Sequence, residues 1–87
     1  MLFEVIYTAR FLRQYRRLTP ALQTEAKEKI TIFKKNPHDP LLKTHKLHGR
    51  LKGYWSFSVN YKYRIIFEYD DKSTAALLKI GDHDIYE

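Results

Sequence analysis

The last third of the chain, from residue 54 to residue 86, contains three strand-like runs, and hydrophobic residues recur at every second position in the first two. In segment 54–60 the odd-numbered positions carry Trp, Phe and Val, and in segment 63–69 they carry Tyr, Ile, Phe and Tyr. Successive side chains of a strand point to opposite faces, so each segment predicts a strand with one apolar face. The short connection at 60–62 predicts a hairpin. A turn at 70–73 and the run TAALLKI complete a predicted three-strand meander.

The first part of the chain predicts one short strand followed by a helix. Residues 2–7, LFEVIY, are β-branched and aromatic, and they predict a strand buried on both faces apart from Glu4. Thr8 predicts a helix N-cap, and we expect a helix from Ala9 to Leu18. Its predicted apolar stripe is Phe11, Leu12, Tyr15 and Leu18, and its predicted outer face is Arg10, Arg13, Gln14, Arg16 and Arg17.

A second helix is predicted from Pro20 to about Lys35. The hydroxyl of Thr19 can cap it, and proline fits its first turn because the missing amide is not needed there. Asn36 precedes a proline and therefore ends it. The predicted buried face is Leu22, Ala26, Ile30 and Phe33, and the predicted outer face is Gln23, Lys27, Lys34 and Lys35.

The remaining segment, 37–53, combines prolines, glycines, histidines and basic residues without a sustained period, so it predicts a loop. Its basic character suits contact with phosphates. The elements together predict an α+β fold of the order β-α-α-β-β-β. We expect a small twisted, mainly antiparallel sheet packed on an αα-hairpin. The 87 residues predict one domain, 1–87.

The charge is positive and unevenly distributed. Segment 1–53 carries twelve basic and four acidic side chains (+8), whereas segment 54–87 carries four and six (−2), which gives the total of +6. A positive field attracts a polyanion such as RNA, DNA, anionic lipid or an acidic protein, although solvated lysines alone produce the same balance. Because the sequence has no membrane-length apolar run and no secretory signal pattern, we expect a cytoplasmic protein without membrane contact.

Several chemistries are disfavoured by the residue types. The sequence has no cysteine, and its neighbouring histidines His45 and His48 lie on an irregular segment, so a zinc site is not expected. None of the serines stands in a glycine-flanked nucleophile turn, and no glycine-rich phosphate loop is present. We therefore expect neither a metal nor another cofactor.

Metal-free RNA cleavage needs a base, an acid and a cation beside the phosphate, and the last third of the chain contains suitable groups. Arg64 offers a permanently charged, forked set of donors, His83 is of a type that titrates near neutral pH, and Tyr86 can stack on a base or hold the phosphate. Structural roles are also possible, because Arg64 can pair with Glu68, His83 can be an exposed turn residue, and Tyr86 can close the core. Further positive charge comes from Lys46, Lys52, Lys62 and Lys79.

Three segments resemble the RelE/ParE superfamily of bacterial toxins: HKLHGRLKGYWSFSV (45–59), YRIIF (63–67) and IGDHDIY (80–86). The resemblance covers nearly the whole chain, and HKLHG and GDHDIY are more similar to the RelE and YafQ-like branch than to the ParE branch. It implies the toxin of a type II toxin–antitoxin system. It also implies an endoribonuclease that cuts mRNA in the ribosomal A site by attack of the 2′-hydroxyl, leaving a 2′,3′-cyclic phosphate without a metal.

The resemblance implies roles for particular residues. Arg64 matches the phosphate-binding arginine, His83 a catalytic histidine or arginine, Tyr86 a terminal aromatic residue, Lys79 an arginine of YafQ-like members, and His45 their loop histidine.

Two positions depart from the family pattern. Ser58 stands where relatives have a lysine or histidine base, and Lys62 stands where YafQ-like members have an aspartate. The identity of the base therefore stays open between His45, His48 and alignment of the substrate by the ribosome.

The resemblance also implies partners. These are the 70S ribosome with its mRNA and a cognate antitoxin, whose acidic or amphipathic C-terminal segment folds on binding; direct sequence-specific DNA contact is not expected. We expect RNA contacts from Arg13, Arg16, Arg17, Lys46, His48, Arg50, Lys52 and Lys62. Two alternatives are a ParE-like poison of DNA gyrase and an inactive relative that retains antitoxin binding.

Overall fold

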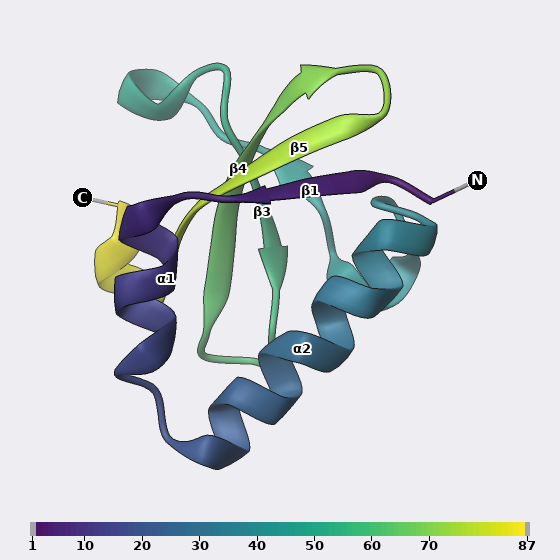
Figure 1. Ribbon diagram of the computed structural model, residues 1–87. Helices are drawn as coiled ribbons and strands as arrows, with labels where there is room; N and C mark the ends of the chain where they lie inside the picture. Colours follow the sequence, from purple (N-terminus) through teal and green to yellow (C-terminus); the bar gives the residue numbers. More distant parts are fainter. Residues whose placement is uncertain (1, 87) are drawn as a thin grey trace.

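The computed structural model describes residues 2–86, except for the side chains of residues 83 and 84. Five strands form one sheet in the order β1-β5-β4-β3-β2, with β1 parallel to β5 and the other neighbours antiparallel (Figure 1). The predicted α+β fold with a mainly antiparallel sheet is therefore confirmed. The elements are β1 (Glu4–Tyr7), α1 (Ala9–Arg16), α2 (Pro20–Lys35), β2 (His45–Lys46), β3 (Trp55–Ser58), β4 (Arg64–Asp71) and β5 (Thr74–Gly81), with short 3-10 turns η1 (Pro40–Leu42), η2 (Gly49–Leu51) and η3 (His83–Tyr86).

Both helices begin at the threonine caps that the sequence predicts. The Thr8 hydroxyl accepts a hydrogen bond from the Phe11 amide at 3.2 Å and donates one to the Leu77 carbonyl at 2.7 Å, which ties the start of α1 to β5. The Thr19 hydroxyl accepts from the Leu22 amide at 3.3 Å. Each cap satisfies an amide that has no partner within the helix. Helix α1 ends at Arg16, two residues earlier than predicted.

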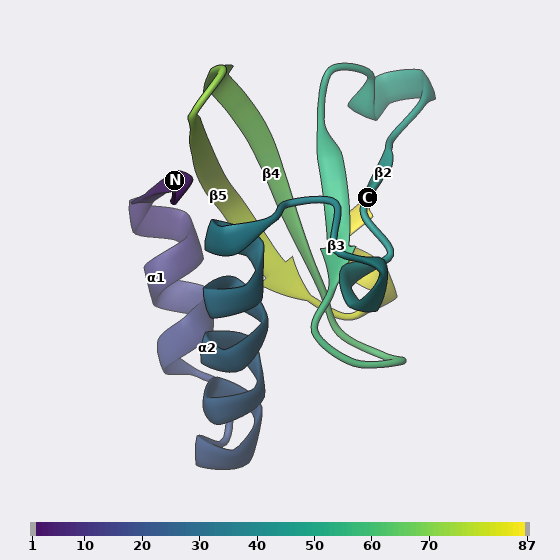
Figure 2. The same ribbon diagram turned by 90° about the vertical axis from the view of Figure 1, so that its right-hand side faces the viewer.

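The main core lies between the helices and one face of the sheet (Figure 2). Phe33 of α2 is fully buried, with its ring centroid 4.6 Å from that of Phe57 on β3 and 4.8 Å from that of Phe67 on β4. Phe11 of α1 is buried in the same cluster. Burial of one such side chain contributes about 2–3 kcal/mol. The aromatic residues of alternating strands and of the helical stripes therefore hold the two layers together.

Helix α1 also covers the open edge of β5. Strand β1 pairs with β5 only as far as Tyr7 and Leu77, whereas β5 continues to Gly81. Beyond β1, the Gln14 side-chain oxygen accepts a hydrogen bond from the Ile80 amide at 2.8 Å. The prediction that Gln14 faces outward is therefore wrong, because this side chain satisfies a strand amide that has no neighbouring strand.

Two other side chains predicted on the outer face of α2 also turn inward. The Gln23 amide group donates to the Tyr15 carbonyl at 3.0 Å and so connects α2 to α1. The Lys34 ammonium lies over the Tyr7 ring, 6.0 Å from its centroid, in a cation–π contact. Polar side chains with long stems thus bridge elements that their sequence period places on the solvent side.

Two predictions about strands are wrong. Strand β1 is not buried on both faces, since Ile6 is 45% and Tyr7 40% exposed, because this strand forms the edge of the sheet. Segment 37–53 is not only a loop, since His45 and Lys46 form β2 and pair with Ser56 and Trp55.

Candidate active site

The sheet face opposite the main core brings together several of the predicted catalytic residues. Cross-strand partners share a face, and the register places His45, Ser56, Ile66 and Lys79 in one row across the sheet. A second row holds Ser58, Arg64 and Gly81. Figure 1 shows η3 on the opposite side of the sheet from α2, against this face.

A β-bulge positions Lys79 on this face. Phe67 pairs with Leu77 and Ile66 pairs with Lys79, so Leu78 is an extra residue in β5. The bulge allows Leu77 and Ile80 both to face the core although they are three residues apart. Strict alternation along TAALLKI does not predict this arrangement.

Tyr86 is held on this face by a buried serine. Ser56 is fully buried, and its hydroxyl oxygen lies 2.9 Å from the Tyr86 phenol oxygen, within hydrogen-bond distance. The turn η3 can fold back because Gly81 has no side chain, since a Cβ there would overlap with the Ile85 side chain. The close contact between Gly81 and Ile85 therefore allows the C-terminal turn to place Tyr86 over β3.

One hollow is lined by two cations, Arg10 and Lys79, and is called the Lys79 hollow. It has a volume of about 350 Å³. Lys79 is half-buried and Arg10, at the start of α1, is exposed. The lining residues are Thr8, Arg10, Leu51, Tyr54, Ile66, Leu78 and Lys79.

A second hollow, the Arg64 hollow, has a volume of about 260 Å³ and is lined by Lys29, Leu41, Lys43, Ser58, Val59, Asn60, Tyr61 and Arg64. Nη1 of Arg64 donates to the carbonyls of Asn60 and Tyr63, the latter at 3.0 Å. Within the described part of the chain, carbonyls of the β3–β4 turn therefore orient the guanidinium, and Glu68 does not. A guanidinium has five N–H donors, so three stay available for a ligand here.

The order of side chains along β3 relates the two hollows. Tyr54, Ser56 and Ser58 point to the same face because they are two residues apart. Tyr54 lines the Lys79 hollow and Ser58 lines the Arg64 hollow. Ser56 lies between Tyr54 and Ser58 on the strand, and its hydroxyl is hydrogen-bonded to the Tyr86 phenol. The Arg64 hollow also includes Lys29 of α2 and Leu41 of η1, so it extends toward the helix side of the sheet. The phenol lies on the other face, at Ser56.

His45 lies beside Ser56 on the neighbouring strand, and its ring orientation is set by a backbone contact. Its Nδ1 is 3.0 Å from the Lys43 carbonyl oxygen. A carbonyl oxygen only accepts hydrogen bonds, so Nδ1 carries the proton and Nε2 of the neutral ring keeps its lone pair. Nε2 is therefore the ring nitrogen of His45 that can accept a proton.

The other predicted residues lie around this face or away from it. The Lys46 ammonium is 5.5 Å from the centroid of the Trp55 ring, on the core side of the sheet, so Lys46 is not part of the face that carries Arg64. Lys62 lies at the β3–β4 turn, 5.9 Å from the Tyr63 ring centroid. The remaining predicted RNA contacts are exposed on η2 and its flanks or on α1: His48, Arg50, Lys52, Arg13, Arg16 and Arg17.

His83 is the first residue of η3, but its side chain lies outside the described part of the structure. Its predicted catalytic role therefore stays a prediction.

Three residues near this face were not among the predicted site residues: Arg10, Tyr54 and Ser56. The signals were present, because the strand alternation puts Tyr54 and Ser56 opposite Trp55, and Arg10 belongs to the arginine-rich face of the first helix. Contact of Ser56 with Tyr86 joins residues thirty positions apart. Such a pairing depends on how the C-terminal turn folds back and is not encoded by a local pattern.

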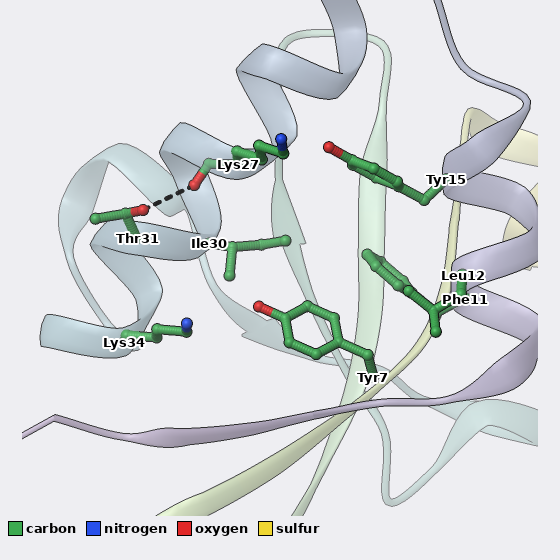
Figure 3. A pocket seen from close by; sticks show the side chains of 8 residues that line it. All are labelled: Tyr7, Phe11, Leu12, Tyr15, Lys27, Ile30, Thr31 and Lys34. Atoms are coloured by element: carbon green, nitrogen blue, oxygen red, sulfur yellow. Dashed lines mark hydrogen bonds between the residues drawn. The ribbon is translucent and has the colours of Figure 1, made fainter.

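An apolar groove lies on the other side of the molecule, between α1 and α2 (Figure 3). Its volume is about 330 Å³, and the rings of Tyr7, Phe11 and Tyr15 project into it together with Ile30. The centroids of Phe11 and Tyr15 are 6.1 Å apart. Two lysines, Lys27 and Lys34, also line this groove.

Within residues 2–86, no three histidine or acidic side chains with described positions come together as a potential metal site. None of the helices described in this range has both the length and the apolar character needed to cross a membrane.

Residues 10–80 match the family of RelE-like toxins of the type II toxin–antitoxin system HigB. Among curated proteins, no sequence matches this chain significantly. The solved toxin–antitoxin complex RelBE2 from Mycobacterium tuberculosis has a similar fold, with a TM-score of 0.81, 20% identity, and coverage of 95% of this chain and 100% of that chain. For YafQ from E. coli the TM-score is 0.79 and the identity is 17%, with coverage of 97% of this chain and 97% of that chain. For the archaeal RelE–RelB complex from Pyrococcus horikoshii the TM-score is 0.76 and the identity is 18%, with coverage of 94% of this chain and 96% of that chain.

Proposed function

Because this chain belongs to the family of RelE-like toxins of type II toxin–antitoxin systems, we propose that it is a metal-independent endoribonuclease that cuts mRNA in the ribosomal A site. The observation that supports this proposal is the strand register, which puts His45, Arg64 and Lys79 on the same face as Ser56, whose hydroxyl contacts the Tyr86 phenol. In this proposal the scissile phosphate binds on this face, and Arg64 and Lys79 supply its cationic contacts. Such preorganised charge stabilises the crowded phosphate of the transition state.

The proposed reaction begins with proton transfer from the ribose 2′-hydroxyl to Nε2 of His45. The 2′-oxygen then attacks the adjacent phosphorus, and the bond from phosphorus to the 5′-oxygen of the next nucleotide breaks. Arg64 and Lys79 neutralise the added negative charge, and His83 is the proposed donor of a proton to the leaving oxygen. The products are a 2′,3′-cyclic phosphate and a free 5′-hydroxyl, so atoms and charge balance without a metal.

The spacing of the strands leaves room for a nucleotide between these groups. His45 on β2 and Lys79 on β5 share one row but are separated by three strand intervals. At about 4.8 Å per interval, their backbones are about 14 Å apart. The two side chains can thus flank a ribose and its phosphate without contacting each other.

The test adds purified protein to a translating ribosome extract with a defined mRNA and maps cut ends by primer extension. We expect cuts at fixed positions within codons, and a rate at least about 100-fold lower for Arg64→Ala, because a preorganised charged donor is lost. Lys72→Ala is the matched control, since Lys72 is an exposed cation in the β4–β5 turn. An intact mRNA at protein concentrations that arrest growth would favour gyrase poisoning, and an intact mRNA without arrest would favour an inactive toxin.

We further propose a cognate antitoxin as the protein partner of this chain. Two solved relatives are described as toxin–antitoxin complexes. The groove between α1 and α2 supports an amphipathic, acidic segment as occupant, because it has aromatic walls and two lysines. Co-purification with the antitoxin should weaken for Lys27→Glu combined with Lys34→Glu, whereas Lys35→Glu, an exposed position on the same helix, should retain it. Equal binding by all variants would contradict this location.

A further inference from the structure

We propose that the Lys79 hollow is a subsite for one nucleotide of single-stranded RNA, with the base against Tyr54 and a phosphate between Arg10 and Lys79. This inference rests on the proposed ribonuclease function for its place beside the cut, but RNA binding at the hollow is measurable without cleavage. It assigns a ligand-binding role to Arg10 and Tyr54.

The shape and size of the hollow suit this ligand. Its volume of about 350 Å³ lies at the lower end of the range for small-molecule sites, which is about 300–1,000 Å³. The apolar side chains of Leu51, Ile66 and Leu78 line it, and Ile66 is only 2% exposed. Tyr54 is half-buried, so part of its surface stays accessible to a ligand.

Three separate elements bring the stacking ring and the two cations together. Arg10 comes from the start of α1, which the Thr8 hydrogen bond to Leu77 fixes beside β5. Lys79 comes from β5, where the β-bulge places it on this face. Tyr54 follows the η2 turn, and its own amide donates a hydrogen bond to the Leu51 carbonyl at 3.0 Å. Aromatic stacking together with flanking cations is the usual chemistry for binding single-stranded nucleic acid.

The lining offers little that distinguishes one base from another. The Thr8 hydroxyl is already engaged by the Leu77 carbonyl and the Phe11 amide. Leu51, Ile66 and Leu78 have no polar side-chain atoms, and every base has a face that can stack on Tyr54. The subsite should therefore hold any of the four nucleotides with similar affinity, so that codon preference arises elsewhere.

The test measures binding of a fluorescein-labelled 2′-O-methyl oligoribonucleotide of about six nucleotides, a length within the usual site sizes. The 2′-O-methyl groups block attack by the 2′-oxygen, so fluorescence anisotropy reports binding alone. Tyr54→Leu should weaken binding by about fivefold or more, whereas Tyr54→Phe should retain it because the ring is kept. Thermal unfolding of each variant checks that it folds.

Arg10 is tested through salt dependence. Arg10→Gln should reduce the slope of log Kd against log salt by about 0.7, which corresponds to one phosphate contact on a single strand. Lys35→Gln removes the same charge from an exposed position at the end of α2 and should leave the slope unchanged. Equal slopes for Arg10→Gln and Lys35→Gln, or unchanged affinity for Tyr54→Leu, would overturn the subsite.

The outcome separates this inference from the proposed ribonuclease. Loss of binding in Tyr54→Leu and Arg10→Gln, with no mRNA cut in the ribosome extract, would establish the RNA subsite and refute the ribonuclease. Normal cutting with binding that is insensitive to both changes would retain the ribonuclease and refute the subsite. A marked preference among A, C, G and U homopolymers would refute the claim that the hollow does not read the base.

Discussion

Replacement of Ser56 by alanine tests the contact that holds Tyr86 on the sheet. The two hydroxyl oxygens are 2.9 Å apart, and Ser56 is fully buried whereas Tyr86 is half-buried. A hydrogen bond between neutral groups contributes about 1 kcal/mol net, so Ser56→Ala should lower the free energy of unfolding by about this amount. Tyr86→Phe should cost about 1–3 kcal/mol, because it leaves the buried Ser56 hydroxyl without its partner.

A double-mutant cycle isolates the contact itself. In the Tyr86→Phe background, Ser56→Ala should cost little, because the bond is already lost, and the coupling energy should be about 1 kcal/mol. Urea unfolding is followed by the fluorescence of Trp55, the single tryptophan, which packs beside Phe67 and Tyr69. The slope of the unfolding free energy against urea should stay unchanged.

Ser58→Ala is the stability control for this cycle. Ser58 is two residues along the same strand and on the same face, and its loss should change the unfolding free energy by less than about 0.5 kcal/mol. Additive effects of Ser56→Ala and Tyr86→Phe would show that the two hydroxyls do not interact in solution, and would contradict the placement of the Tyr86 phenol at Ser56.

Three further predictions concern the edge of β5, the β4–β5 turn and the basic face of α1. Gln14→Leu should lower the free energy of unfolding in urea by about 1–3 kcal/mol, because the Ile80 amide loses its acceptor. Hydrogen exchange of that amide should accelerate, and unchanged exchange would contradict the role of Gln14 as its acceptor. The Ser73 amide lowers the pKa of Asp71, so wild-type stability relative to Asp71→Asn should be greatest above pH 4 and decline as pH falls through the lowered pKa; a flat difference in pH titration would contradict this. Ribosome binding should lose part of its salt dependence when glutamine replaces all three of Arg13, Arg16 and Arg17, and an unchanged salt slope would show that they contact no phosphate.

The sequence predicted those parts of the fold that depend on local rules. Thr8 and Thr19 start the helices because a hydroxyl cap acts within one turn. Alternation predicted β3 and β4 because the strand period is local. The two-residue strand β2 has no such period, since it exists only through pairing with Ser56 and Trp55. The exposure of β1 follows from its place at the sheet edge, which depends on the order of all five strands.

The candidate site was predictable to a similar extent. The segments that resemble RelE-type toxins pointed to Arg64, Lys79 and His45, and the register brings these three onto one face of the sheet. Arg10 reaches the same face only because α1 replaces β1 along the edge of β5. A helix pattern indicates that Arg10 is on the outer side of α1, but the neighbour that it meets there depends on tertiary structure.

The central claim is that this toxin cuts mRNA by attack of the 2′-hydroxyl adjacent to the scissile phosphate. The most direct measurement uses ribosomes programmed with an mRNA in which a single 2′-deoxynucleotide replaces the ribonucleotide at the mapped cut. We expect cutting at this position to stop. The all-RNA message should be cut and should carry a 2′,3′-cyclic phosphate at the new end. Continued cutting at the 2′-deoxy position would contradict the proposed chemistry.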